Sequence, residues 1–244
     1  MIGVGKMRGL GGTQMIPSLR VSVFGISRSG KDFSINSAKE ILNASGLNFK
    51  HLPVIPTVRD YAKPILGKEF NKTTMDEKGL LMEVFRMKIA DRTTIPFLIL
   101  DEHYCFPVAY GGKPLSNEYT DAKFPYFIRE GEDGREYEVM LKERWLHSTD
   151  LVIYLNPDPN VILSRIRSSE GAKRNDQITV EDIEEWKRFE ISSLDDFCRP
   201  LDLQFTVLNM NEGAAARICQ EIIAFTMTPE RSMGFHDRWW QFSE

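Results

Sequence analysis

A glycine-rich turn followed by a lysine is the feature of this sequence that most clearly suggests chemistry. The short run Val21–Phe24 leads into Gly25-Ile-Ser-Arg-Ser-Gly30-Lys31, and apolar residues then recur at helical spacing. Glycines let the backbone wrap with its N–H groups pointing inward, and the start of a helix adds partial positive charge. Lys31 supplies a full charge. The segment therefore predicts a nest for the β- and γ-phosphates of a nucleotide.

The residue after the lysine is an acid. In the usual phosphate-loop pattern a Ser or Thr stands there and touches magnesium, whereas this chain has Asp32. The first magnesium contact is therefore open between Asp32 itself, Ser34 and a water. The candidate residues for binding the nucleotide are Gly25, Ser27, Arg28, Ser29, Gly30, Lys31, Asp32 and Phe33.

A second set of candidate residues, two acids, lies at the end of a predicted buried strand. The apolar run Phe97–Leu100 is followed by Asp101 and Glu102, which predicts a parallel strand that delivers carboxylates to the crevice beside the glycine loop. Asp101 is expected to order magnesium or to act as a base, with Glu102 the less favoured alternative. The predicted metal residues are therefore Asp32 and Asp101. Glu102 and the nearby Tyr104 are also candidate substrate contacts.

Arginines gather in a loop between two predicted helices. Arg165, Arg167 and Arg174 lie in a charged, glycine-containing stretch, which is either solvated surface or a closing lid at about residues 167–178. A lid would bring guanidinium groups over the phosphates and neutralise charge that develops during transfer. We therefore expect Arg165 and Arg174, together with Lys31 and Asp101, to be the catalytic residues.

Three further residues are candidates for binding an acceptor. Arg59 lies in the predicted loop 56–64, where it is either an anion clamp or a surface arginine. A capping box at Thr74–Glu77 opens a helix that carries Phe85 and Arg86. Phe85 is expected mainly in the core, with a substrate platform as the alternative, and Arg86 is expected near the polar side.

The elements that position these residues alternate between strands and helices. We expect strands at 21–24, 49–55, 95–100, 151–155 and 205–208, with a small hairpin or surface excursion around Asp133-Gly134. Helices are expected after each of the first four strands, including one at 136–147 and one capped by the segment Asn156–Asn160. This alternation predicts a three-layer α/β/α fold with a mainly parallel five-stranded sheet and a lid.

The whole chain sets further bounds. Its 244 residues suit one domain at 21–226, preceded by a flexible leader at 1–20 and followed by an aromatic tail at 227–244. The tail is expected to pack on its own domain or on a second copy, which leaves a homodimer open. A net charge of −4 gives no basic field for nucleic acid. Three scattered cysteines suit the reducing cytoplasm, and no apolar run approaches the roughly 20 residues that cross a bilayer.

Taken in order, these motifs resemble the nucleoside and nucleoside-monophosphate kinase superfamily, thymidylate kinases in particular. The resemblance covers about 21–225 and implies the P-loop kinase fold, ATP as donor and Mg²⁺ as cofactor. It also implies that Arg59 lies where thymidylate kinases bind their acceptor, and the stretch from Lys173 to Asp176 looks like the lid of adenylate and uridylate/cytidylate kinases. The Gly-Lys-Asp form of the loop is similar to that of phage deoxynucleotide kinases and animal phosphomevalonate kinase.

One departure from this family bears on the acceptor. Thymidylate kinases have an arginine within the triplet that ends the third strand, but here the triplet reads Asp101-Glu102-His103. The phosphate clamp is then Arg59, Arg86 or Arg92, or the acceptor is not a monophosphate. We expect a phosphotransferase that acts on a small acceptor, most simply a nucleoside or nucleoside monophosphate. The alternatives are a kinase of another metabolite, such as a phosphorylated alcohol, and a nucleotide-binding switch or assembly module.

Overall fold

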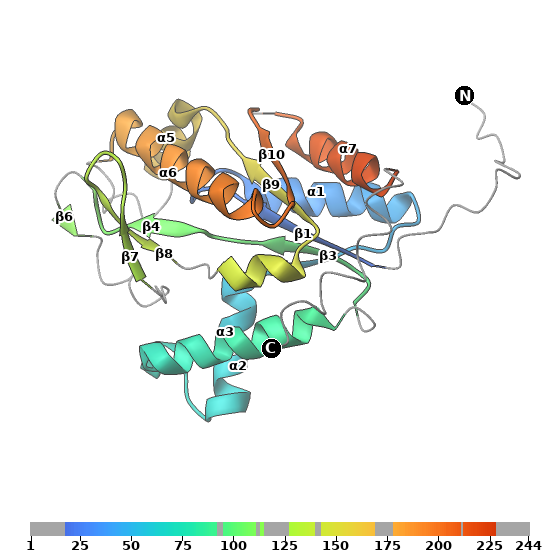
Figure 1. The fold of residues 1–244 in the computed structure, drawn as a ribbon, viewed down its shortest axis with the longest axis horizontal. Coiled ribbons are helices and arrows are strands. Elements are labelled where there is room, and N and C mark those ends of the chain that lie inside the picture. Colours follow the sequence, from blue (N-terminus) through green and yellow to red (C-terminus); the bar gives the residue numbers. More distant parts are fainter. Residues whose placement is uncertain are drawn as a thin grey trace, which may run out of the picture.

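A parallel sheet forms the centre of the molecule (Figure 1). The computed structural model describes residues 18–91, 95–110, 113–114, 127–139, 143–168, 178–210 and 212–227. Five strands lie in the order β10-β9-β1-β3-β2, and every neighbouring pair is parallel, as the sequence predicts. Their bounds are β1 Leu19–Phe24, β2 Lys50–Pro53, β3 Phe97–Asp101, β9 Leu151–Leu155 and β10 Gln204–Leu208.

Helices cover both faces of this sheet and give three layers. Alternate residues of each strand point to opposite faces. On one face, Val21 of β1 and Ile153 of β9 join the core formed by helices α1 (Lys31–Ala44) and α7 (Ala214–Thr226), which lie side by side in Figure 1. On the other face, Tyr154 of β9 joins a second core with four helices, which are α2 (Val54–Leu66), α3 (Met75–Ala90), α5 (Pro159–Ser168) and α6 (Val180–Cys198). The predicted three-layer α/β fold is confirmed.

Local signals explain where several helices begin. Helix α3 (Met75–Ala90) starts with the expected capping box, in which Thr74 and Glu77 bond each other's backbone N–H groups. Helix α6 (Val180–Cys198) starts with a second box formed by Thr179 and Asp182. Asp158 accepts a hydrogen bond from the Asn160 backbone at the start of helix α5 (Pro159–Ser168). These caps satisfy N–H groups that a helix leaves unpaired at its first turn.

The expected loop at 56–64 is wrong, because this segment is helical. Strand β2 ends at Pro53, and helix α2 (Val54–Leu66) follows without a loop. Its buried residues Val54, Val58 and Ala62 recur every four positions, which is a helical spacing. Pro56 does not oppose the helix, since a proline in the first turn removes no hydrogen bond that the helix would make.

The expected helix at 136–147 is wrong in its first four residues, which form a strand. Residues Glu136–Val139 form strand β8, which pairs antiparallel with β7 (Phe127–Glu130), and a short 3-10 helix, η2, covers Glu143–Ser148. Within β8, Tyr137 and Val139 are buried, so the burial alternates as in a strand. The predicted hairpin around Asp133-Gly134 is confirmed by this pair.

Short elements complete the described structure. Strand β4 (Cys105–Pro107) extends the β7–β8 hairpin to a three-stranded sheet, which lies at one end of the molecule in Figure 1. Strands β5 (Ala109–Tyr110) and β6 (Lys113–Pro114) form a separate pair. A 3-10 turn, η1 (Phe70–Lys72), joins α2 to α3.

Some expected features lie outside the described residues. These are nearly all of the leader, residues 169–177 of the lid and all but the first residue of the tail. Strand β1 begins at Leu19, two residues before the expected start of the first strand at residue 21. Among the described helices, none has both the length and the apolar character that a membrane span requires.

Candidate phosphate and metal site

The glycine loop joins the central strand β1 to helix α1. Gly25 follows β1 with a φ of 148°, and a Cβ there would lie 2.8 Å from the carbonyl oxygen of Leu155. Gly30 has a φ of 92° and forms the N-cap of α1, while Arg28 between them also has a positive φ of 66°. Such left-handed residues turn successive N–H groups toward one side. These positive φ angles are the backbone feature that the predicted anion nest requires.

Lys31 lies at the mouth of this loop. This lysine is only 6% exposed, and its amino group donates hydrogen bonds to the carbonyl oxygens of Gly25 and Ile26. The same nitrogen lies 3.8 Å from Oδ1 of Asp101. Strand pairing explains this proximity, since β3 lies beside β1 and Asp101 is in register with Val23 near the end of β1. The structure thus brings the predicted lysine and carboxylate together.

The carboxylate of Asp101 is strongly influenced by its surroundings. Burial raises its pKa to about 7, while the charge of Lys31 opposes the shift and the neighbouring carboxylate of Asp32 adds to it. Its Oδ1 atom has no hydrogen-bond partner among the described residues. A buried carboxylate oxygen without a hydrogen bond is a suitable ligand for a cation.

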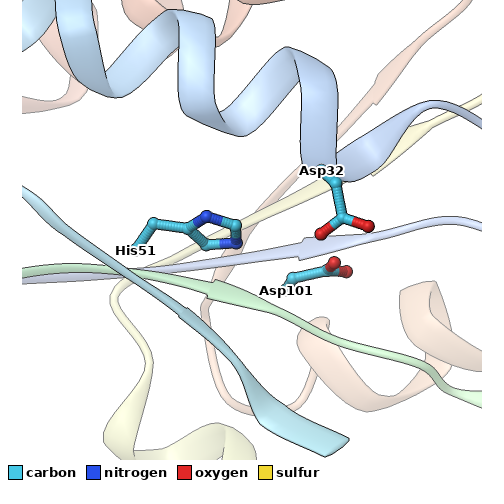
Figure 2. A group of neighbouring side chains, drawn as sticks. All are labelled: Asp32, His51 and Asp101. Carbon is cyan, nitrogen blue, oxygen red and sulfur yellow. The ribbon is translucent and has the colours of Figure 1, made fainter. Parts of the chain in front are cut away.

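Three side chains from three different elements converge here (Figure 2). Asp32 comes from the first turn of α1, His51 from β2 and Asp101 from the end of β3, and one ligand atom of each lies within 4.8 Å of the other two. His51 is in register with Ile99 on β3, so it shares a sheet face with Asp101, two residues further along. The predicted metal pair is therefore brought together, and a histidine joins it.

Sequence reasoning missed His51. A lone histidine beside an apolar residue carries no local signal of ligand chemistry. The signal that exists is topological: the position lies on the strand next to β3, and the pleat places it on the same face as Asp101. Recognising it would require the strand order and the register, neither of which is written in the local sequence.

Arg165 contacts the outside of the glycine loop. From α5 its guanidinium Nη1 donates to the carbonyl oxygens of Arg28 at 3.2 Å and Ser29 at 3.0 Å. A Cβ on Gly30 would lie 3.1 Å from the same nitrogen. Arg165 is thus placed beside the predicted phosphate nest. Arg167 is exposed near the end of α5, and Arg174 lies outside the described residues.

Two predicted substrate residues bind each other. The guanidinium of Arg86 on α3 forms two hydrogen bonds of 2.7 and 2.8 Å with the carboxylate of Glu102, and both residues are buried. The guanidinium carbon also lies 4.8 Å from the ring centroid of Trp145. Glu102 faces α3 while Asp101 faces α1, because consecutive residues at the end of a strand alternate between faces.

The remaining predicted substrate residues occupy different environments. Phe85 and Tyr104 are fully buried in the core beneath α3 and α6. Arg59 is exposed on α2, where its guanidinium carbon lies 5.8 Å from the ring centroid of Phe70. Of the loop residues, Arg28, Asp32 and Phe33 are exposed, whereas Ser29 is buried and Ser27 is half-buried.

A buried acid on α6 was also missed. Glu190 is fully buried and accepts hydrogen bonds from the Tyr154 hydroxyl at 2.9 Å and the Cys105 backbone N–H at 3.2 Å. Burial raises its pKa to about 7, while the charge of Lys31 opposes the shift. In the sequence this residue is one of several acids in a charged helix, so nothing local distinguishes it.

The residues present fit a nucleotide and a divalent cation. The Ser29 hydroxyl of the loop is buried without a hydrogen-bond partner among the described residues. A hydroxyl in that position can donate to a phosphate oxygen. The carboxylates of Asp32 and Asp101 supply the oxygen ligands that Mg²⁺ prefers. The site can therefore hold an anion and a cation next to each other.

Comparison with known proteins gives only distant similarities. No protein-family model and no curated protein matches the chain. Among solved structures, shikimate kinase from Acinetobacter baumannii in complex with shikimate is 16% identical with a TM-score of 0.40, over 84% of this chain and 91% of that one. A sugar kinase from Janibacter sp. HTCC2649 is 14% identical with a TM-score of 0.42, over 85% and 94% of the two chains. Deoxyadenosine kinase from M. mycoides with bound dATP is 14% identical with a TM-score of 0.41, over 84% and 99%.

Values this low do not identify a reaction.

Proposed function

We propose that this chain is a kinase that transfers the γ-phosphate of ATP to a small acceptor. The observation that carries the proposal is the juxtaposition at the glycine loop. The amino group of Lys31 lies 3.8 Å from the buried carboxylate of Asp101, at the mouth of a loop whose glycines have positive φ angles. An anion nest, a mobile cation and a metal-binding carboxylate are the parts that phosphoryl transfer needs in one place.

Each residue has a distinct role in this proposal. The loop N–H groups and the Ser29 hydroxyl hold the β- and γ-phosphates, and Lys31 turns from the loop carbonyls to neutralise their oxygens. Arg165, anchored beside the loop, adds positive charge at the transferred group. Asp32 and Asp101 hold Mg²⁺, which when bound neutralises phosphate charge. Positioning and charge neutralisation supply most of the rate, because the protein does little covalent work in this reaction.

The reaction balances without a further reactant. A nucleophilic oxygen of the acceptor forms a bond to the γ-phosphorus, and the bond from that phosphorus to the bridging oxygen of ADP breaks. If the acceptor oxygen is a hydroxyl, its proton leaves to a carboxylate or to water.

For the acceptor we propose a nucleoside or a nucleoside monophosphate. The sequence resemblance to thymidylate kinases supports this choice, and Arg59 supplies an exposed cation on α2. Arg86 is already engaged by Glu102, so Arg59 is the better clamp of the two. We further propose that segment 167–178 is a lid that brings Arg174 over the transferred phosphate, and that the enzyme works in the cytoplasm.

The proposal is tested by a lysine substitution. Lys31→Ala should lower ATP-dependent transfer by orders of magnitude, because it removes the charge at the transferred phosphate, while far-UV circular dichroism stays unchanged. Lys72→Ala, which alters an exposed lysine on η1, is the matched control and should keep full activity. ATP consumption would be measured across nucleosides, nucleotides and phosphorylated alcohols.

Two outcomes would count against the proposal. An active Lys31→Ala protein would show that the loop does not bind the transferred phosphate. ATP binding with no stimulation by any acceptor class would instead indicate a nucleotide-dependent switch.

A further inference from the structure

The proposed function leaves one side chain of the three-residue cluster unused. His51 on β2 turns its imidazole toward the carboxylates of Asp32 and Asp101 (Figure 2), and the ligand atoms of the three residues lie within 4.8 Å of one another. Ligands around one first-row metal ion, at bond lengths of about 2.1 Å, lie within roughly 4.2 Å of each other. Small side-chain rotations would therefore bring all three onto a single ion.

The imidazole is oriented as a metal ligand. Its Nδ1 atom lies 3.1 Å from Oδ1 of Asn36 on α1. An amide oxygen only accepts, so Nδ1 carries the proton and Nε2 presents its lone pair. This Nε2 atom is buried and has no hydrogen-bond partner within the described part of the chain. Metal-binding histidines are typically fixed in this way, by a hydrogen bond from the other ring nitrogen.

The opposite side of the cluster independently suggests a cation. Asp101 is 8% exposed, and its Oδ1 atom also has no hydrogen-bond partner among the described residues. Within the described part of the chain, the cation paired with it is Lys31, whose Nζ lies 3.8 Å from Oδ1, too far for a hydrogen bond. With Asp32 beside it, the cluster places two carboxylates against one ammonium group. A divalent cation would offset the remaining negative charge.

We propose that His51 Nε2, Asp32 and Asp101 form one three-ligand site for a divalent cation, and that the imidazole makes this site prefer Mn²⁺, Co²⁺ or Zn²⁺ to Mg²⁺. The inference rests on the metal role proposed above for Asp32 and Asp101, and it adds the third ligand and the metal preference. Carboxylate and water ligands suit both Mg²⁺ and Mn²⁺, whereas imidazole nitrogen suits later transition metals such as Zn²⁺ and is a poorer ligand for Mg²⁺ than for Mn²⁺. Replacing one oxygen ligand by nitrogen therefore shifts the selectivity.

The test uses Mn²⁺ alone as the probe, on the full-length protein after treatment with a chelator. Electron paramagnetic resonance measures free Mn²⁺ and gives the dissociation constant, and pulsed experiments detect a nitrogen atom bound to the ion. The wild type should show this nitrogen coupling. His51→Ala should lose it and should bind Mn²⁺ at least about tenfold more weakly, since removing a ligand should cost no less than the 10–100-fold typical of an outer-shell change.

Two controls make the result specific. Lys50→Gln changes the preceding residue of β2, whose exposed side chain points to the other side of the strand, and should leave Mn²⁺ binding unchanged. Competition with Mg²⁺ should show that the preference for Mn²⁺ over Mg²⁺ falls in His51→Ala, because the lost nitrogen ligand favours Mn²⁺ more than Mg²⁺. Thermal unfolding of each variant without metal checks that the fold is kept.

The outcomes separate this inference from the proposed function. Mn²⁺ bound without nitrogen coupling, or bound equally by His51→Ala, would overturn the three-ligand site even if phosphate transfer with Mg²⁺ continues. Nitrogen coupling in a protein that transfers no phosphate would support the metal site and reject the kinase. Failure of the wild type to bind Mn²⁺ at all would overturn the inference directly.

Discussion

At the scale of single residues, Gly25 is a position where the backbone conformation and the close neighbours together require glycine. Its φ of 148° belongs to a region that side chains strongly disfavour, and a Cβ would approach both the Leu155 carbonyl oxygen at 2.8 Å and the Ser29 hydroxyl at 2.9 Å. The loop can therefore pass close to β9 only because no side chain is present. A residue with a Cβ would have to reshape the nest.

We predict that Gly25→Ala destabilises the protein and removes nucleotide binding. Strain together with the close contact should lower the free energy of unfolding by at least about 2 kcal/mol. Gly46→Ala is the matched control, because Gly46 has a φ of 88° but nothing within 4 Å of its Cβ position. That variant should lose only about 1 kcal/mol and keep ATP binding. Urea unfolding and calorimetric ATP titration measure both effects, and equal losses would contradict the prediction.

Some site residues could be predicted from the sequence, and others could not. Lys31 and Asp101 were predictable because each follows a recognisable strand, and parallel strands deliver their ends to one edge of the sheet. His51 and Glu190 were not, because their chemistry comes from neighbours distant in the chain. The pKa of Glu190, for example, rises through burial against β4 and β9, which lie more than 30 residues away.

At the scale of elements, the Arg86–Glu102 pair links α3 to the end of β3. Both partners are buried, and their two hydrogen bonds of 2.7 and 2.8 Å satisfy charges that would otherwise be unpaired in the core. Removing one partner of such a pair leaves an uncompensated buried charge, while removing both does not. The pair therefore specifies how α3 lies on the sheet.

We predict strong non-additivity at this pair. Arg86→Met and Glu102→Gln should each destabilise the protein, with a loss of about 3–5 kcal/mol for the arginine substitution. The double variant should be more stable than the sum of the two losses implies. A double-mutant cycle from denaturant unfolding measures the coupling. Additive losses would show that the two side chains act independently, contrary to their geometry.

The bounds of helices and strands were predictable where a local sequence pattern, such as a capping box or an apolar run, agreed with how the segment packs in the fold. The capping box at Thr74 and the apolar run of β9 both led to correct assignments. Segment 56–64 did not. It was expected as a loop after the second strand, whereas Val54, Val58 and Ala62 pack against the core at the four-residue spacing of a helix. The strand β8 was likewise decided by pairing with β4 and β7, a contact that no local pattern contains.

At the scale of the whole molecule, Glu190 ties the second core together and makes stability depend on pH. Its hydrogen-bond donors come from β4 and β9, and Lys31 of α1 is the cation that influences it. Burial raises its pKa from 4.5 to about 7, so the folded protein keeps a proton that the unfolded chain has already released. Stability from this residue is complete below about pH 4.5 and is lost as the pH rises to about 7.

We predict that Glu190→Gln removes this dependence. Relative to the variant, the wild type should lose about 3 kcal/mol of unfolding free energy between pH 4.5 and 7, because a pKa difference of about 2.5 corresponds to that energy. Both proteins retain Asp101, so its own titration cancels in the comparison. Urea unfolding at pH 5, 6, 7 and 8 measures the difference. Parallel curves for the two proteins would refute the assignment.

Strand β2 and helix α2 meet at Pro53 and Val54 with no connecting residue. The strand carries His51, and the helix carries Arg59. The proposed cation ligand and the proposed acceptor clamp therefore lie on one continuous segment without a flexible loop between them. Any tilt of the helix on engaging an acceptor would be transmitted to the imidazole, and capture of a metal ion would in turn restrain the helix. Thermodynamic linkage then requires the two binding events to strengthen or weaken each other by the same factor.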